Sequence, residues 1–295
     1  MHIANIIGSD PDDDTLTYSI TGGVDAAMFT IVGTMLHLAT GISADYENKT
    51  QLVVVIEASD TGGLTKSETF TIDVTDVLET QTGTTTNDTF NGSLARELVD
   101  GGAGVDLVSY SLLNKNVSFS LNSNDQLVIK NSAEQSDILI SMERISLTDT
   151  SYALDTDGNA GTAAKVIISA FGAENLSSYM SSILSVVDGG KTIASLTDYV
   201  IELGLIDAVI GSSSNDSFVT HVFENVVGRL PNIVEQAIYT DYLDNGTYTK
   251  SSLLALAANT TLTENLVTAN SVDLIGVPGS ADGELLAIQY DLGLG

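Results

Sequence analysis

Carboxylates recur at a regular spacing in a stretch of the chain that is rich in glycine, asparagine and threonine. Three consecutive nine-residue segments cover residues 83–91, 92–100 and 101–109. Each begins with glycine, has an acid at its sixth position and has a large apolar residue at its eighth. These acids and apolar residues are Asp88, Glu97, Asp106, Phe90, Val99 and Val108. Because calcium prefers oxygen ligands from carboxylates and carbonyls, the spacing indicates a calcium site.

The third segment has the most complete pattern, with Gly101, Gly102 and Gly104 before Asp106. Glycines allow positive φ, so backbone carbonyls can turn toward one cation while the carboxylate supplies charge. In a coil with two segments per turn, Asp88 and Asp106 stack on one side, and Glu97 lies on the other. The sequence therefore predicts one calcium ion bridging the Asp88 and Asp106 turns. A metal-free coil is the alternative, because the first two segments lack some of these glycines.

A second set of acids lies in predicted loops of the first 79 residues, beside glycine, asparagine and threonine, where oxygen ligands for a cation are expected. The members singled out as candidate ligands are Asp10, Asp12, Asp45, Glu47, Asp60 and Asp76. Acids that only solvate these loops are the alternative interpretation.

Composition narrows the classes of function. The chain has 39 acidic and 10 basic residues, a net charge of −29, which repels nucleic acid and anionic lipid and attracts cations. It has no cysteine, so disulfides, thiolate zinc sites and a cysteine nucleophile are excluded. No apolar run is long enough to cross a bilayer, and no N-terminal signal is recognisable. We therefore expect no membrane insertion. If the protein is exported, either it uses a route that needs no such signal or this chain is a fragment.

Hydrophobic periodicity divides the chain into three predicted domains. Residues 1–79 alternate apolar and polar positions and contain turn signals, which indicates a small β-sandwich. Residues 80–161 hold the nine-residue repeat, predicted as a short parallel β-roll, and further alternating segments. Residues 162–295 change to helical periodicity, which indicates an α-helical bundle. The predicted fold class is multidomain, β then α.

The first domain resembles a bacterial cadherin-like repeat that is truncated at its N-terminus. The runs that carry the resemblance are GSDPDDDTLTYSI (8–20), ADYE (44–47), EASDTGG (57–63) and TDVLE (75–79). The resemblance implies calcium ligands at junctions between successive repeats. Asp10, Asp12 and Asp60 would then face a preceding repeat, whereas Asp45, Glu47 and Asp76 would face the following module.

The second and third domains resemble the C-terminal regions of RTX proteins, which Gram-negative bacteria export by type I secretion and which fold outside the cell with calcium. The runs GGAGVDLVSYS (101–111), MERISL (142–147) and YALDTDGNAG (152–161) carry this resemblance. The helical part is similar to the DUF4214 family through NDSFV (215–219), NVVGRLP (225–231) and LDNGTYT (243–249). The run DTDGN (155–159) also opens like an EF-hand loop, but its twelfth position is Val166, so we interpret it as a turn into a helix.

No catalytic arrangement is recognisable, so we expect no enzyme and no catalytic residues. The histidines His2, His37 and His221 belong to no metal-binding or nucleophile motif. The leading hypothesis is a calcium-binding extracellular adhesin tail whose partners are other repeats of the same large protein and a cell-surface glycan or protein. Two alternatives remain: the noncatalytic export region of an RTX enzyme, and a carbohydrate- or peptide-binding module.

Overall fold

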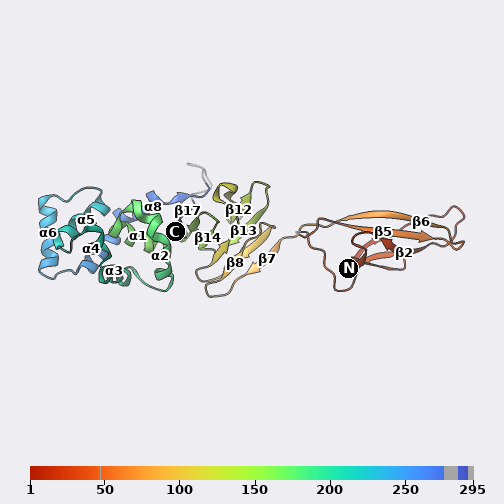
Figure 1. Ribbon diagram of the computed structural model, residues 1–295, viewed down its shortest axis with the longest axis horizontal. Coiled ribbons are helices and arrows are strands. Elements are labelled where there is room, and N and C mark those ends of the chain that lie inside the picture. Colours follow the sequence, from red (N-terminus) through yellow and green to blue (C-terminus); the bar gives the residue numbers. More distant parts are fainter. Residues whose placement is uncertain (47, 276–284, 292–295) are drawn as a thin grey trace. The chain divides into compact units, whose positions relative to one another are not determined.

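The computed structural model describes residues 1–46, 48–275 and 285–291 (Figure 1). Strands come first along the chain and most helices follow, which confirms the predicted order of β then α. The chain divides into two compact units, Met1–Leu78 and Glu79–Gly295.

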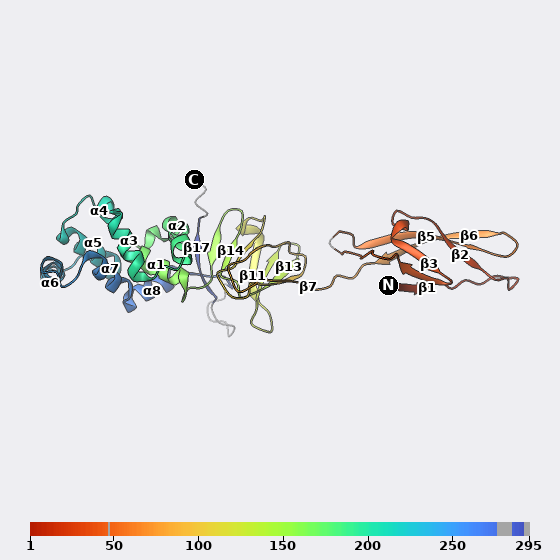
Figure 2. The same ribbon diagram turned by 90° about the horizontal axis from the view of Figure 1, so that it is seen from below.

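The unit Met1–Leu78 consists of two three-stranded antiparallel sheets, ordered β1-β4-β3 and β2-β5-β6. Figure 2 shows β1 and β3 in the layer opposite β5 and β6. The strands are β1 (His2–Asn5), β2 (Thr17–Gly22), β3 (Phe29–Val32), β4 (Met35–Leu38), β5 (Gln51–Ser59) and β6 (Thr65–Asp73). In β5, alternate residues Leu52, Val54 and Ile56 are buried, as a strand with one face on the core requires. They pack with Phe29 and Leu36 between the sheets.

The unit Glu79–Gly295 begins with strands that alternate between two sheets. One sheet aligns β7 (Glu79–Thr82), β9 (Glu97–Asp100) and β13 (Ser136–Ile140) in parallel. The other aligns β8 (Thr89–Asn91), β10 (Leu107–Ser109) and β14 (Arg144–Ser146), also in parallel. The chain therefore winds as a flattened coil, with a turn at each edge. Apolar side chains at the eighth positions of the repeats, Phe90, Val99 and Val108, share the core between the sheets.

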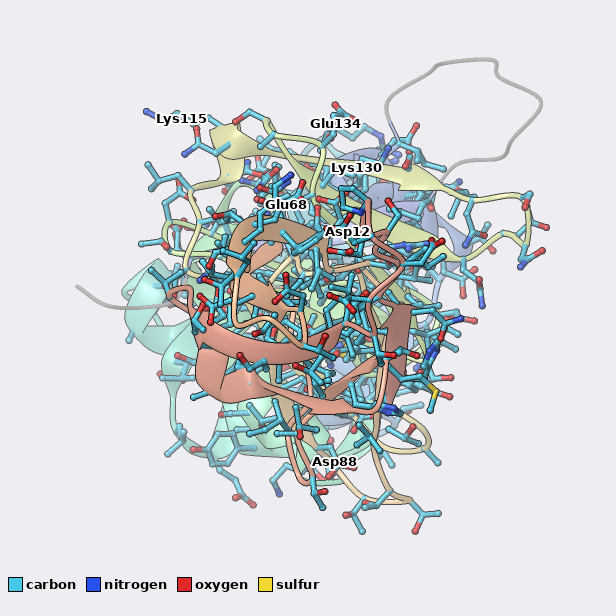
Figure 3. All side chains as sticks on the ribbon, turned by 90° about the vertical axis from the view of Figure 1, so that its right-hand side faces the viewer. Asp12, Glu68, Asp88, Lys115, Lys130 and Glu134 are labelled. Carbon is cyan, nitrogen blue, oxygen red and sulfur yellow. The ribbon has the colours of Figure 1, made fainter. Side chains whose placement is uncertain are left out.

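A hairpin interrupts the coil between β10 and β13. Its strands β11 (Val117–Leu121) and β12 (Leu127–Asn131) pair antiparallel, and β12 continues the sheet beside β13. Lys130 and Glu134 form an exposed i,i+4 ion pair of 3.5 Å at the turn after β12 (Figure 3). The inserted hairpin shifts the spacing of the residues that follow, so the nine-residue period is lost after residue 109.

The helical part begins at Asn159, three residues earlier than predicted, and contains eight helices within the described ranges. They are α1 (Asn159–Phe171), α2 (Leu176–Asp188), α3 (Ile193–Glu202), α4 (Leu205–Ile210), α5 (Asn215–Val227), α6 (Ile233–Asp244), α7 (Lys250–Ala258) and α8 (Thr261–Asn270). Capping boxes begin α3, α6 and α7, where Thr192, Asn232 and Thr249 accept backbone N–H groups. The core of the bundle contains fully buried Phe218 and Leu254.

The chain returns from the helices to the sheets. After β16 (Val272–Asp273), the strand β17 (Leu286–Tyr290) pairs with β15 (Ser151–Ala153), which extends the sheet of β14. Helix α2 packs against β17, and Ile288 and Tyr290 join the core of the bundle. The structure thus places two strands at the end of the region that the sequence assigned to helices. Within the described residues, no helix is long and apolar enough to span a bilayer.

Candidate metal centre

Asp88 and Asp106 lie next to each other at one edge of the coil. The register of β8 and β10 pairs Thr89 with Leu107, so the acids that precede these residues are also aligned. The backbone N–H of Asp88 donates a hydrogen bond of 2.7 Å to Oδ1 of Asp106. The structure therefore brings together the two carboxylates that the sequence analysis placed on one side.

The glycines before Asp106 are required by how closely the turns stack. Gly102 and Gly104 have φ of +89° and +140°, conformations that other residues rarely adopt. A Cβ on Gly102 would lie 2.3 Å from the carbonyl oxygen of Thr84, and one on Gly104 would lie 2.8 Å from the carbonyl carbon of Thr86. Consecutive turns on this side are thus in backbone contact, and only glycine fits between them.

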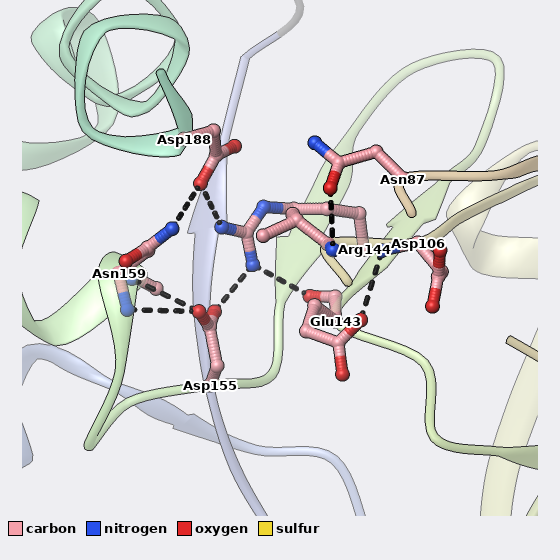
Figure 4. A network of polar contacts seen from close by, with 9 residues as sticks. Asn87, Asp106, Glu143, Arg144, Asp155, Asn159 and Asp188 are labelled. Atoms are coloured by element: carbon pink, nitrogen blue, oxygen red, sulfur yellow. Dashed lines mark hydrogen bonds and ion pairs between the residues drawn. The ribbon is translucent and has the colours of Figure 1, made fainter. Parts of the chain in front are cut away.

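A third carboxylate extends the row. The register of β10 and β14 pairs Leu107 with Arg144, so Glu143 lies beside Asp106. Glu143 Oε2 accepts a 2.8 Å hydrogen bond from the backbone N–H of Asp106 (Figure 4). We call the row of Asp88, Asp106 and Glu143, with the turns before them, the glycine-rich edge.

Sequence reasoning missed Glu143 because it falls outside the nine-residue period. A signal was nevertheless present. Like Asp106, Glu143 is an acid followed, two residues later, by a buried apolar residue and then by serine. Burial, Asp106 and Asp155 all raise the pKa of Glu143, while its bond from the Asp106 N–H and the nearby Arg144 act in the opposite direction.

Asp106 differs from Asp88 in how its carboxylate is satisfied. Asp88 Oδ2 accepts the backbone N–H of Thr84 at 2.7 Å and the hydroxyl of Thr84 at 2.9 Å. The corresponding Gly102 N–H donates instead to Asp100 Oδ1 at 3.1 Å. Asp106 is fully buried, and its Oδ2 has no hydrogen-bond partner among the described residues.

A buried acceptor without a donor costs on the order of 1–3 kcal/mol, and more when it carries charge. A cation at Asp106 Oδ2 would remove that cost. The orphaned oxygen, the positive-φ glycines and the clustered carboxylates therefore fit a hard, oxygen-binding ion such as calcium.

The opposite edge of the coil is satisfied internally around Asp137. Asp137 is fully buried, and it aligns with Glu97 through the pairing of β9 and β13. Its carboxylate accepts the N–H groups of Leu94 and Glu97, each at 3.1 Å, and the hydroxyl of Tyr110 at 2.9 Å. Burial raises the pKa of Asp137 and outweighs these three bonds. We call this Glu97–Asp137 side the closed edge.

The turn at the closed edge has a different backbone. Leu94 and Arg96, rather than glycines, carry positive φ of 58° and 57°. Leu94 turns its side chain into the core, where it is 2% exposed. Oε2 of the partly buried Glu97 is also buried without a hydrogen bond within the described part of the chain. Two backbone N–H groups and the Tyr110 hydroxyl thus hold Asp137, and an apolar side chain packs at this turn, where the other edge has glycines.

The predicted ligands in the N-terminal unit are divided among several loops. Asp10 and Asp60 line one hollow of about 390 Å³. Asp10 Oδ1 accepts the N–H of Asp12 at 2.8 Å, and Asp60 Oδ1 accepts the N–H of Leu64 at 2.8 Å. Both acids therefore stabilise their own turns.

The other predicted ligands of this unit lie elsewhere. Asp45 Oδ1 accepts the N–H of Asn48 at 3.0 Å, and Asp76 is a partly buried residue that follows β6. Glu47 lies outside the described residues. Among the described residues of this unit, the buried acid is Asp25, which the sequence analysis did not single out. Lys49 Nζ contacts both its oxygens at 2.6 Å and holds the pKa of Asp25 below its usual value.

Beside Glu143, a buried arginine connects the coil with the helices. The Arg144 guanidinium forms ion pairs with Asp155 and with Asp188, the latter at 2.9 Å (Figure 4). Burial opposes the charged guanidinium, but these carboxylates outweigh it and raise the pKa of Arg144. Asp155 Oδ2 also accepts the N–H groups of Asn159 and Ala160 at the start of α1. The DTDGN run therefore leads into a helix, and its first aspartate serves as a cap and ion-pair partner.

No group of three or more His, Cys, Asp or Glu side chains in the described ranges is arranged to hold a metal by itself. A calcium site here would therefore draw further oxygen ligands from backbone carbonyls, amide side chains or water, as calcium sites in proteins commonly do. No protein-family model matches the chain, and the search of curated proteins found no match.

Proposed function

We propose that the chain is a noncatalytic, calcium-binding segment of an extracellular bacterial adhesin that is exported by type I secretion. The single observation that carries the proposal is Asp106 Oδ2, a fully buried carboxylate oxygen with no donor among the residues that the structure describes. It lies at an edge where positive-φ glycines bring backbone and carboxylates together.

The proposal identifies the coil as a calcium-binding β-roll of the RTX type, the N-terminal sandwich as a cadherin-like repeat and the helices as a DUF4214-like domain. Parallel strands that alternate between two sheets support the first assignment. Two packed antiparallel sheets support the second. The partners would be other repeats of the same large protein and a glycan or protein on a cell surface. His221 supports a noncatalytic role, because its ring contacts the Ala170 carbonyl at 2.8 Å between two helices.

Calcium would act as a folding ligand. Extracellular modules bind it at roughly 10⁻⁴ to 10⁻³ M, so sites that are empty in the cytosol fill outside the cell. A ligand at about ten times its dissociation constant adds roughly 1.4 kcal/mol of stability. The surplus of acids in the chain, 39 against 10 basic residues, opposes the compact state through charge repulsion, which bound cations would reduce.

Thermal melting of the full chain, followed by circular dichroism in EGTA, in millimolar calcium and in equal magnesium, tests the proposal. We expect calcium to raise the melting temperature by several degrees and magnesium to have a much smaller effect. The double variant Asp88→Ala with Asp106→Ala should lose the shift assigned to the coil. Equal melting of the wild type in all three buffers would reject calcium binding.

A further inference from the structure

The glycine-rich edge contains two niches that are related by one turn of the coil. Each is bounded by the first glycine of a segment, by the aspartate five residues later and by a carbonyl from the next turn. At Gly83 these are Asp88 Oδ2 and the carbonyl oxygen of Gly101, which lie 3.0 and 2.1 Å from the position that a Cβ added to Gly83 would occupy. At Gly101 they are Asp106 Oδ2 and the carbonyl of Ser141, at 2.6 and 2.2 Å.

The first niche is already filled by protein donors. Asp88 Oδ2 accepts both the N–H and the hydroxyl of Thr84. These two bonds satisfy the oxygen that would otherwise face a cation. Asp88 therefore has a structural role in its own turn, and its N–H secures Asp106 Oδ1.

The second niche lacks such donors. Asp106 is 0% exposed, and its Oδ2 has no hydrogen-bond partner in the part of the chain that is described. Ser141 adopts a φ of 47°, which is unusual for a residue with a side chain, and its carbonyl lies against Gly101. Asp106 Oδ2 and the Ser141 carbonyl thus face the same glycine, as two ligands of one ion would.

Glu143 brings a second negative charge to this niche. Its Oε2 accepts the N–H of Asp106, and Figure 4 shows the carboxylates of Asp106 and Glu143 pointing to the same side. Ser141 and Glu143 also line a cavity of about 360 Å³, together with Asp125 and others.

We infer that the divalent cation, calcium, is held between the Asp106 turn and the Ser141–Glu143 turn, rather than between the Asp88 and Asp106 turns. Its protein ligands are the carboxylates of Asp106 and Glu143 and the carbonyl of Ser141. This inference rests on the proposed function. It moves the calcium ion from the Asp88–Asp106 position, which the spacing of the repeat predicts, to the next turn along the coil. It also assigns a ligand role to Glu143, which lies outside the nine-residue period.

Calcium titration of the full chain by isothermal calorimetry, with Glu143→Gln and Asp88→Asn compared with the wild type, tests the inference. The glutamine retains an acceptor for the Asp106 N–H but loses the charge, so we expect affinity for one site to fall by about tenfold or more. Asp88→Asn should change that affinity by less than about threefold, because Asp88 is not a ligand. Glu134→Gln removes an exposed acid from the hairpin and serves as the matched control.

The outcomes separate the inference from the proposed function. Strong loss in Asp88→Asn with wild-type affinity in Glu143→Gln would overturn the inference and leave a calcium site between Asp88 and Asp106. Absence of calcium binding by the wild type would overturn both. Thermal melting in EGTA shows whether each variant folds. If Glu143→Gln does not fold, Glu143→Asp replaces it, because aspartate retains the charge on a shorter side chain. Weakened binding by folded Glu143→Asp, with Asp88→Asn unchanged, supports the site, and wild-type affinity rejects it.

Discussion

At the glycine-rich edge, Asp106 is left with one carboxylate oxygen that nothing in the described chain satisfies, whereas at the closed edge Asp137 accepts three hydrogen bonds. Both aspartates are fully buried; Asp106 directly precedes β10, and Asp137 lies within β13. The difference lies in the turns that stack beside or precede them: Asp137 receives its backbone donors from the turn before β9. Gly102 turns its N–H to Asp100, while at the other edge Leu94 and Glu97 direct theirs to the carboxylate. Protein donors thus satisfy the Asp137 carboxylate at one edge, whereas Asp106 Oδ2 at the other is left for an external ligand.

The largest expected effect is on the free energy of unfolding, and it distinguishes a buried carboxylate held by protein donors from one held by a cation. Asp137→Ala leaves three donors unsatisfied and should lower the free energy of unfolding by about 3 kcal/mol or more, equally in EGTA and in calcium. Asp106→Ala removes the acceptor of one N–H and should cost less in EGTA, on the order of 1–2 kcal/mol, but more in calcium. Urea denaturation in both buffers measures this. A calcium-dependent loss in Asp137→Ala would contradict the assignment of the closed edge.

A smaller effect is expected from the stacking of the glycine turns. Gly102→Ala combines positive φ with a Cβ 2.3 Å from the Thr84 carbonyl oxygen, so it should destabilise the fold by about 2–4 kcal/mol. Gly190→Ala is the matched control, because Gly190 has φ of +93° but nothing within 4 Å of its Cβ position. That variant should lose only about 1–2 kcal/mol. Equal losses in urea denaturation would show that backbone contact between turns is unimportant.

The smallest effect concerns pH. Because burial raises the pKa of Asp137, the folded state binds its proton more tightly than the unfolded state does. The stability from this difference is complete below the unfolded pKa, near 3.8, and is lost as pH rises through the folded value. We therefore expect the melting temperature of the wild type minus that of Asp137→Asn to decrease as pH increases from 4 to 7. A difference that increases with pH would show that the hydrogen bonds to Asp137 outweigh its burial.

An acid with the opposite shift provides the control for this measurement. Arg229 and the N–H of Asn232 lower the pKa of Glu235 to about 2. Its contribution is present above the unfolded pKa of about 4.5 and is lost as pH falls through about 2. Glu235→Gln should therefore lose little stability relative to the wild type at the lowest accessible pH and more at pH 7.

Much of the fold could be predicted from periodicity. The β-then-α order and the 18-residue alignment of Asp88 with Asp106 follow from local patterns that the structure retains. Glu143 and Asp137 could not be found by counting, because the hairpin β11–β12 adds residues to the coil without adding a turn. The strand β17 was also missed, since its pairing with β15 joins segments more than 130 residues apart.

The sequence by itself determined which residues could serve as ligands and which turns require glycine, because both depend on side-chain chemistry and local backbone freedom. Only the tertiary structure decided which carboxylate keeps a free oxygen. Asp88 and Asp106 occupy the same position in the repeat, but Thr84 satisfies Asp88 Oδ2, while Gly102 donates elsewhere and Asp106 Oδ2 has no partner within the described ranges. The donors to Asp88 Oδ2 come from its own turn, whereas the burial of Asp106 between the turns of Asp88 and Glu143 depends on stacking across the coil.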